Sequence, residues 1–348
     1  MNPASRDALA ESACRFGSDG QLVGVLTRAV GPADGTLATQ ALATAHGQVS
    51  ARIGVLLLNA GVVSRMGPHR FNVKLSRSMA RLGHPVLRFD LSGQGDSLAA
   101  LGQLRRGEQV IRDIRDAIDR LQHDAKVDKV LIVGICSGAN QGWSAALQDP
   151  RIAGLVMIDP YTYVTRKTAF HYNLRRFLHR SAAENVTMAW RGLTQAFVDL
   201  RVRGKASPPP AETTVACEAD HDAVQVGGKL PANQYAAGMQ QLVDRDVRLL
   251  LVFTGTWLRF YSYANQFHDV FGRHPFVAKL LIEFAPHYDH TFTLVGAQQR
   301  MIRHIEDWSR EQLVEPAVTT YAAPVSPAAA RVSVSEAERL RANSTVVI

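Results

Sequence analysis

The sequence predicts an α/β fold in which a mostly parallel sheet is covered by helices on both faces. Short apolar runs of strand length recur along the chain, and segments with helical periodicity separate them. Continuous apolar runs are typical of strands buried on both faces of a parallel sheet. The predicted strands comprise residues 53–59, 84–90, 129–134, 151–159, 247–253 and 277–284.

Between these runs, apolar side chains recur at helical spacing. The clearest case is residues 108–121, where Val110, Ile114 and Leu121 share one face. Ahead of the first run, two short segments within residues 15–27 flank an Asp-Gly turn and predict a β-hairpin. Further helices are predicted over residues 71–82, 139–147, 234–243, 262–272 and 294–313.

Two separate parts of the chain are expected to build the sheet, residues 15–160 and 236–313. The alternation of strands and helices stops over residues 161–235, which we interpret as a helical insertion that caps the core. We expect residues 1–14 to be a flexible N-terminus. Residues 314–348 are rich in Ala, Pro, Ser and Val, and a disordered tail is predicted there.

Composition narrows the classes of protein to which the chain can belong. No apolar run is long enough for a membrane span, and the first residues lack the layout of a signal peptide. The three cysteines lie far apart and form no Cys-x-x-Cys pair, which fits a reducing compartment. We therefore expect a cytoplasmic protein without a metal site or a membrane span.

The net charge is +8, and the basic excess is concentrated between residues 161 and 205. Such a run is either a solvated helical face or a docking surface for an acidic partner. No recognised nucleic-acid-binding motif accompanies the charge, so we expect no nucleic-acid partner.

The most informative motif is Gly134-Ile-Cys-Ser-Gly138, which lies between a predicted strand and a predicted helix. This is the context of a nucleophile elbow, where a tight turn needs small residues two positions before and after the nucleophile. The N-terminus of the following helix favours a thiolate and a developing oxyanion. The alternative is a buried structural cysteine beside two packing glycines.

Over residues 15–313 the chain resembles the α/β-hydrolase superfamily. Its cysteine variants are similar to dienelactone hydrolases, polyester synthases and some thioesterases. The resemblance rests on four stretches, which are Asn59-Ala-Gly-Val-Val63, Arg88-Phe-Asp-Leu-Ser-Gly-Gln-Gly-Asp-Ser97, Gly134-Ile-Cys-Ser-Gly138 and Tyr288-Asp-His-Thr-Phe292. The second of them contains no G-x-G-x-x-G fingerprint, and we expect no cofactor.

The resemblance implies that Cys136 is the nucleophile and that His290 is the general base. His290 follows the last predicted strand, as the chain order of this family requires. His287 is its nearest competitor. The family usually places the acid after the strand written here as residues 249–255, but no carboxylate follows that strand.

Asp159, at the end of the predicted strand over residues 151–159, is the alternative acid, or else a turn residue before Pro160. Asp269 is a third option. A Cys–His pair depends less on an acid than a Ser–His pair, because a thiol ionises more readily than a hydroxyl.

By the same resemblance, two backbone N–H groups would form the oxyanion hole. One belongs to Ser137, directly after the nucleophile, and the other to Val62 or Gly61. Arg65 and Arg70 are candidates for binding a substrate carboxylate or phosphate, or else solvated loop charges.

Tyr161, at the start of the insertion, is a candidate for lining an apolar acyl site, or else part of the core of the cap. The basic insertion could dock an acidic acyl carrier protein or coenzyme A.

A cysteine nucleophile in this fold implies acyl transfer through an acyl-cysteine intermediate. Because that intermediate is itself a thioester, we expect a thioesterase, cyclase or acyltransferase acting on coenzyme A or carrier thioesters. Hydrolysis of a carboxylester or a lactone is the alternative reaction. A catalytically silent binding subunit is an alternative of another class, which the missing acid after residues 249–255 keeps open.

Overall fold

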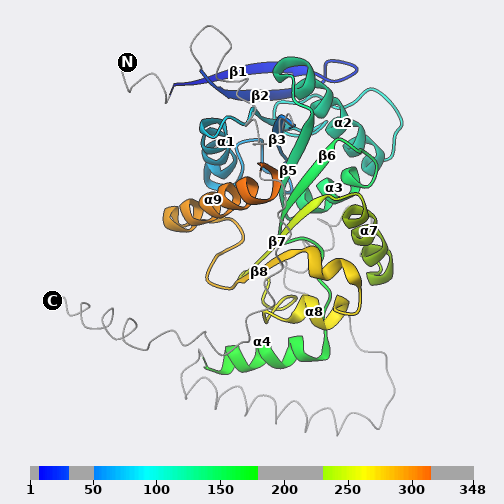
Figure 1. Cartoon of the computed structure of the whole chain (residues 1–348), viewed down its shortest axis with the longest axis vertical. Coiled ribbons are helices and arrows are strands. Elements are labelled where there is room, and N and C mark those ends of the chain that lie inside the picture. Colours follow the sequence, from blue (N-terminus) through cyan, green and yellow to red (C-terminus); the bar gives the residue numbers. More distant parts are fainter. Residues whose placement is uncertain (1–7, 31–50, 179–229, 315–348) are drawn as a thin grey trace, which may run out of the picture. The chain divides into compact units, whose positions relative to one another are not determined.

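The computed structural model describes residues 8–30, 51–178 and 230–314. Its strands are β1 (Leu9–Phe16), β2 (Leu22–Ala29), β3 (Ile53–Leu57), β4 (Val86–Asp90), β5 (Lys129–Ile135), β6 (Ile152–Ile158), β7 (Arg248–Thr254) and β8 (Leu281–Ala285). They form an eight-stranded sheet in the order β1-β2-β4-β3-β5-β6-β7-β8 (Figure 1). The β1–β2 and β2–β4 pairs are antiparallel, and the other neighbours are parallel.

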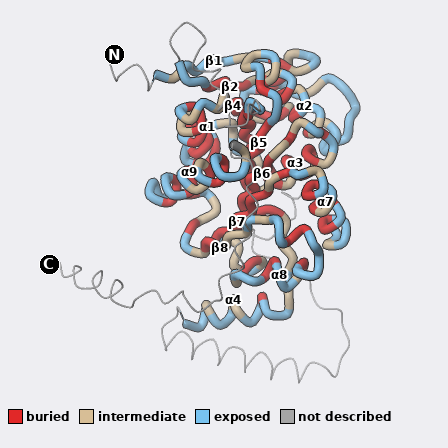
Figure 2. Tube along the Cα trace, viewed as in Figure 1, coloured by how far each residue is buried: buried red, intermediate tan, exposed pale blue. Residues whose placement is uncertain are grey.

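The helices that accompany the sheet are α1 (Phe71–Arg81), α2 (Arg106–Ala125), α3 (Ser137–Ala146), α4 (Arg166–Leu178), α7 (Ala232–Asp244), α8 (Gln266–Phe271) and α9 (Val295–Ser309). One buried apolar cluster joins the sheet to α2, α3 and α7. A second cluster joins the other face of the sheet to α1 and α9. Figure 2 shows buried residues concentrated in the strands and on the helix faces turned toward them.

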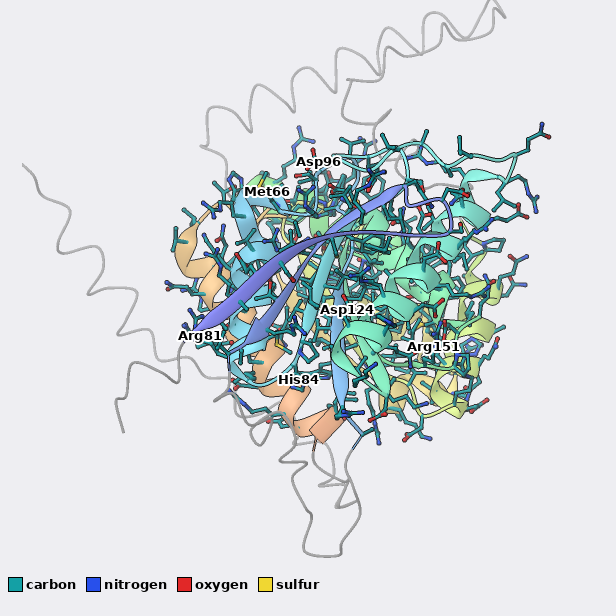
Figure 3. All side chains as sticks on the ribbon, turned by 90° about the horizontal axis from the view of Figure 1, so that it is seen from above. Met66, Arg81, His84, Asp96, Asp124 and Arg151 are labelled. Carbon is teal, nitrogen blue, oxygen red and sulfur yellow. The ribbon has the colours of Figure 1, made fainter. Side chains whose placement is uncertain are left out.

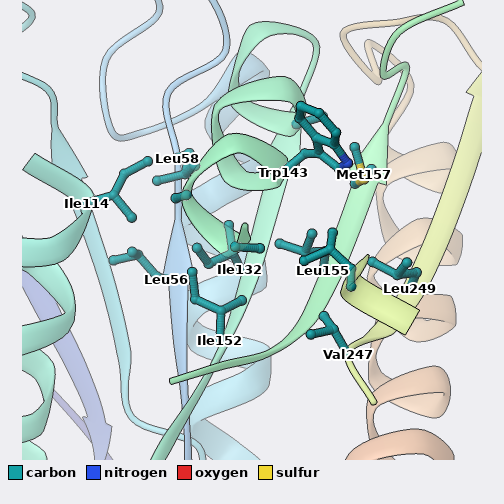
Figure 4. Close-up of a cluster of buried hydrophobic side chains, with 14 of the residues drawn as sticks. Leu56, Leu58, Ile114, Ile132, Trp143, Ile152, Leu155, Met157, Val247 and Leu249 are labelled. Carbon is teal, nitrogen blue, oxygen red and sulfur yellow. The ribbon is translucent and has the colours of Figure 1, made fainter. Parts of the chain in front are cut away.

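Side chains alternate between these two clusters along the inner strands, as the pleat of a strand requires. Leu56 and Ile132 lie in the cluster beneath α2 and α3, to which Trp143 of α3 also belongs (Figure 4). Val55 and Leu131 lie in the cluster beneath α1 and α9. The apolar runs are continuous because both faces are covered, and the predicted fold class is confirmed.

Two boundaries differ from the predicted ones. The hairpin begins at Leu9, which pairs with Ala29, so a strand occupies part of the segment predicted to be flexible. The run predicted as a strand over residues 277–284 begins inside a 3₁₀ helix, Pro275–Lys279, and β8 starts only at Leu281. Val277 lies in this helical turn, and its side chain is buried in the core. A short apolar sequence does not show whether its residues form a helical turn or a strand.

Most of the predicted cap and tail lies outside the described residues. Of the cap over 161–235, the structure describes α4 with the segment leading into it, and the start of α7. The tail predicted over 314–348 lies beyond the described part apart from its first residue. Among the helices that are described, none is both long and apolar enough to cross a bilayer.

Candidate active site

The nucleophile elbow is built between β5 and α3. Cys136 has φ 57° and ψ −119°, a strained conformation for a residue with a Cβ atom. A Cβ atom on Gly134 would lie 2.3 Å from the carbonyl carbon of Gly138, and one on Gly138 would lie 2.5 Å from the carbonyl oxygen of Asn59. The backbone N–H of Cys136 donates to Ile158 at 2.8 Å. Both glycines are therefore required for the turn that holds this cysteine.

The loop after β3 meets the start of α3 directly above this turn. Ser137 is the first residue of α3, so its N–H has no acceptor within the helix. The hydroxyl oxygen of Ser137 accepts the N–H of Gly61 at 2.9 Å. This bond commits the N–H of Gly61 to anchoring the loop, which leaves Ser137 and Val62 as the predicted oxyanion donors.

His290 lies in the loop after β8 and is fixed by its own backbone. Its N–H donates to the hydroxyl of Thr256 at 2.7 Å. The neighbouring carboxylate of Asp289 accepts the N–H groups of Thr291 and Thr293 at 3.1 and 3.0 Å, which closes the turn. The ring nitrogen Nδ1 of His290 lies 2.6 Å from Oδ2 of Asp159.

Asp159 comes from the end of β6, next to the strand that usually carries the acid. Its backbone has φ 49°, and its N–H donates to Val252 at 2.8 Å. Thr254, the last residue of β7, donates its N–H to Oδ1 at 2.7 Å and its hydroxyl to Oδ2 at 2.6 Å. The Asp159 side chain is 3% exposed, and both of its oxygens accept hydrogen bonds from Thr254.

The Thr-Gly-Thr segment at the end of β7 contains no carboxylate, but its two threonines position Asp159 and His290. Thr254 holds the acid, and Thr256 holds the loop that carries His290. A Cβ atom on Gly255 would lie 2.0 Å from the carbonyl oxygen of Pro286, so the turn packs tightly against that loop. The sequence analysis did not identify these two threonines. Their position at the end of a strand, where a hydroxyl group can donate to a carboxylate, was a signal that could have indicated them.

The alternative acid, Asp269, and the alternative base, His287, make contacts with other residues. The carboxylate of Asp269 accepts the hydroxyl of Tyr263 at 2.7 Å and pairs with Lys167 at 2.9 Å. His287 is exposed, and its ring packs on Tyr288 with centroids 4.1 Å apart. Among the predicted candidates, the structure therefore brings together Cys136, His290 and Asp159.

The electrostatics of this group favour a charged histidine. Burial lowers the pKa of His290, but hydrogen bonds with the Asp159 carboxylate and with the Cys136 side chain, and the attraction of both charges, raise it to about 9. A histidine with this pKa is an imidazolium at neutral pH. It can stabilise a thiolate on Cys136 and can later supply a proton to a leaving group.

A further neighbour of His290, missed by the sequence analysis, is Trp257. Its indole Nε1 lies 3.0 Å from Nδ1 of His290, and the two rings meet edge to face with centroids 5.3 Å apart. Trp257 follows the Thr-Gly-Thr turn, so the same loop that orients the acid and the histidine also places this indole.

The predicted substrate-binding residues have different environments. The guanidinium of Arg65 pairs with the buried carboxylate of Asp90 and, at 2.6 Å, with Asp96. The ion pair of Arg65 with Asp96 joins the loops after β3 and β4, in which Figure 3 labels Met66 and Asp96. These ion pairs assign Arg65 a structural role, because its charge is directed at two carboxylates of the protein rather than outward.

Arg70 is exposed, with φ 62°, at the residue before α1. Tyr161 is half-buried and donates its N–H to Oδ1 of Asn140 at 3.0 Å. Its ring meets those of Trp143 and Tyr235 edge to face, at centroid distances of 6.2 and 5.7 Å. Tyr161 therefore packs in an aromatic cluster beneath α3, one turn of helix from the nucleophile.

Over the described parts of the chain, no three His, Cys, Asp or Glu side chains are grouped so that they could hold a metal ion.

Comparison with known structures supports the fold. An esterase from Pyrococcus furiosus is similar with a TM-score of 0.51 and 12% identity, over 90% of this chain and 95% of that one. An esterase from Thermogutta terrifontis has a TM-score of 0.46 and 13% identity, over 87% and 99% of the two chains. An esterase domain from Rhodothermus marinus has a TM-score of 0.44 and 16% identity, over 88% and 100%.

A comparison with curated proteins finds no match. A family model described as serine aminopeptidase, S33, matches residues 52–248, which is more than half of the 348 residues. The match includes the elbow and Asp159. The chain is an enzyme of the α/β-hydrolase type, and it belongs to the serine aminopeptidase S33 family.

Proposed function

We propose that the protein is an acyl-transfer enzyme that uses Cys136 as nucleophile, His290 as acid and base, and Asp159 as the group that orients the histidine. The observation that carries this proposal is the short contact between Nδ1 of His290 and the buried Asp159 carboxylate, on the side of the ring away from Cys136. It favours the proton on Nδ1, which leaves Nε2 for the reacting groups.

In the first step, the Cys136 thiolate attacks an acyl carbonyl and forms a C–S bond. The carbonyl oxygen becomes an oxyanion, for which the N–H groups of Ser137 and Val62 are the proposed donors. The oxyanion then collapses, and the bond to the leaving group breaks. His290 gives the Nε2 proton to the leaving group, which departs as a neutral thiol or alcohol.

In the second step, neutral His290 takes a proton from water or from another acceptor through Nε2. The oxygen or nitrogen of that acceptor attacks the thioester carbon of acyl-Cys136. The C–S bond breaks, and the sulfur leaves as a thiolate beside the newly formed imidazolium. The products are a carboxylic acid or a transferred acyl group, and the resting pair is restored.

The acyl-cysteine is close in free energy to a thioester substrate, so loading from coenzyme A or a carrier protein would be nearly reversible. Acceptors other than water can then compete, which favours a thioesterase, cyclase or acyltransferase. The basic residues of α4, among them Arg166, Arg175 and Arg176, would suit an acidic acyl carrier protein. Hydrolysis of carboxylesters or lactones through the same residues is the second candidate, because the similar protein from Pyrococcus furiosus is described as an esterase.

A silent binding subunit is less well supported. Strained backbone persists only where the surrounding structure enforces it, and here Cys136 is held strained beside an oriented histidine. A scaffold has no use for either feature.

Intact-protein mass spectrometry with a panel of acyl-coenzyme A and acyl-carrier thioesters tests the proposal. We expect a mass gain that is lost in Cys136→Ala and persists longer in His290→Ala. Cys14→Ser is the matched control, since Cys14 is half-buried and burial raises the pKa of its thiol. Turnover of simple esters through Cys136 without thioester loading would favour the ester hydrolase, and no reaction with either class would refute acyl transfer.

A further inference from the structure

Two groups contact the same nitrogen of His290. The Asp159 carboxylate lies 2.6 Å from Nδ1, and the indole N–H of Trp257 points at Nδ1 from 3.0 Å. An indole N–H can only donate, and an ionised carboxylate can only accept. Nδ1 carries either one proton or one lone pair in its ring plane, so it cannot satisfy both partners at once.

The two hydrogen bonds therefore belong to two different protonation states of His290. When Nδ1 carries a proton, it donates to Asp159, and the indole N–H has no lone pair on this nitrogen to which it can donate. When Nδ1 carries the lone pair, it accepts from Trp257, and the single proton of the neutral ring is on Nε2. The carboxylate selects one tautomer of the neutral ring, and the indole selects the other.

We propose that Trp257 competes with Asp159 for Nδ1 of His290 and thereby limits how readily His290 acts as the base that releases the acyl group from Cys136. Trp257 would thus be a positioning residue that acts through the histidine. The inference rests on the function proposed above, whose second step requires neutral His290 to take a proton from water through Nε2.

That step is possible only when Nε2 has a lone pair, which means that the proton of the neutral ring is on Nδ1 and faces Asp159. A ring whose Nδ1 accepts from Trp257 has its proton on Nε2 and cannot deprotonate water. The C–S bond of the acyl-enzyme then stays intact for longer. Trp257 would therefore extend the lifetime of acyl-Cys136 and give an acceptor other than water more time to bind.

The charged and titratable groups around His290 come from three elements. Asp159 at the end of β6 and Cys136 at the elbow both act on its pKa. Asp289, from the turn of His290 itself, is occupied with Thr291 and Thr293. On the same turn His287 packs on Tyr288.

Trp257→Phe keeps an aromatic ring and removes the N–H, and it is the first variant to examine. Long-range ¹H–¹⁵N spectra of histidine-labelled protein report the tautomer and the pKa of His290, whose signals are assigned by their loss in His290→Ala. In the wild-type protein we expect neutral His290 to hold a substantial share of the Nε2–H tautomer. In Trp257→Phe we expect the Nδ1–H tautomer and a pKa higher by about 0.7 pH units, the equivalent of one ordinary hydrogen bond.

The lifetime of the acyl-enzyme provides the second readout. We expect Trp257→Phe to release the acyl group to water about five-fold faster, with the rate of acyl loading little changed. Phe260→Leu is the matched control, because it alters the ring that packs beside Trp257 at 6.1 Å and leaves the indole N–H in place. An unchanged tautomer and an unchanged lifetime in Trp257→Phe would overturn the inference, and so would the same change in Phe260→Leu.

A measurement on the unaltered protein covers the case in which Trp257→Phe does not fold. A ¹⁵N–¹⁵N coupling across the hydrogen bond between Nε1 of Trp257 and Nδ1 of His290 is expected above pH 9, and its absence there contradicts the competition. These spectra need no substrate. Failure of any thioester or ester to load would refute the proposed function, whereas failure of the tautomer test alone would refute only the role of Trp257.

Discussion

The Asp159→Asn substitution removes the charge that faces His290 and is expected to change how stability depends on pH. In the wild-type protein the pKa of His290 is raised from 6.5 to about 9. Because the raised pKa belongs to the folded state, the pairing stabilises the fold fully below about pH 6.5, and this contribution is lost as the pH rises through about 9. The shift corresponds to about 3 kcal/mol at most, which Asp159 shares with Cys136.

Urea denaturation of both proteins at pH 6, 7.5 and 9.5 measures this contribution. We expect Asp159→Asn to be less stable by about 1–3 kcal/mol at pH 6, and the difference to shrink as the pH approaches 9.5. Asp269→Asn is the matched control, since its exposed carboxylate pairs with Lys167 and does not contact the histidine. A destabilisation of Asp159→Asn that is the same at all three pH values would refute the assigned pairing.

Three further substitutions test how the site is built. Gly138→Ala places a methyl group 2.5 Å from the Asn59 carbonyl oxygen, and we expect a loss of about 2–4 kcal/mol, measured by thermal unfolding, together with loss of activity. Thr254→Val removes the hydroxyl donor to Asp159 but keeps the backbone donor, and turnover is expected to fall about ten-fold in steady-state assays. Asp90→Asn leaves the partly buried guanidinium of Arg65 with Asp96 as its remaining carboxylate partner, and we expect a loss of about 1–3 kcal/mol in chemical denaturation with the pH profile of activity unchanged.

The elbow that holds Cys136 could be predicted from sequence because its signal is local. Gly134, Cys136 and Gly138 form one short motif between a strand and a helix, and the clashes that make both glycines necessary arise within or next to that turn. His290 could be placed because chain order alone puts it after the last strand. In both cases the sequence signal is local, although distant residues such as Asn59 and Thr256 complete the geometry.

The acid and its supports could not be settled in this way. Whether Asp159 reaches His290 depends on the pairing of β6 with β7, which puts Thr254 beside it. The proposed role of Trp257 depends on its indole N–H pointing at Nδ1 of His290, and the orientation of a side chain cannot be inferred from the sequence. The ion pairs of Arg65 could not be predicted either, because its partners, Asp90 and Asp96, follow a different strand.

The central proposal is that His290 activates Cys136 as the nucleophile, and the alkylation rate of Cys136 at pH 6.5 tests this most directly. An ordinary thiol is only about 1% thiolate at that pH, so a paired thiolate reacts up to about 100-fold faster. Iodoacetamide labelling, located by peptide mapping, should modify Cys136 far faster than Cys14, and His290→Ala should abolish the difference. Equal labelling rates for Cys136 and Cys14 in the wild-type protein, or a fast Cys136 that is unaffected by His290→Ala, would contradict the account.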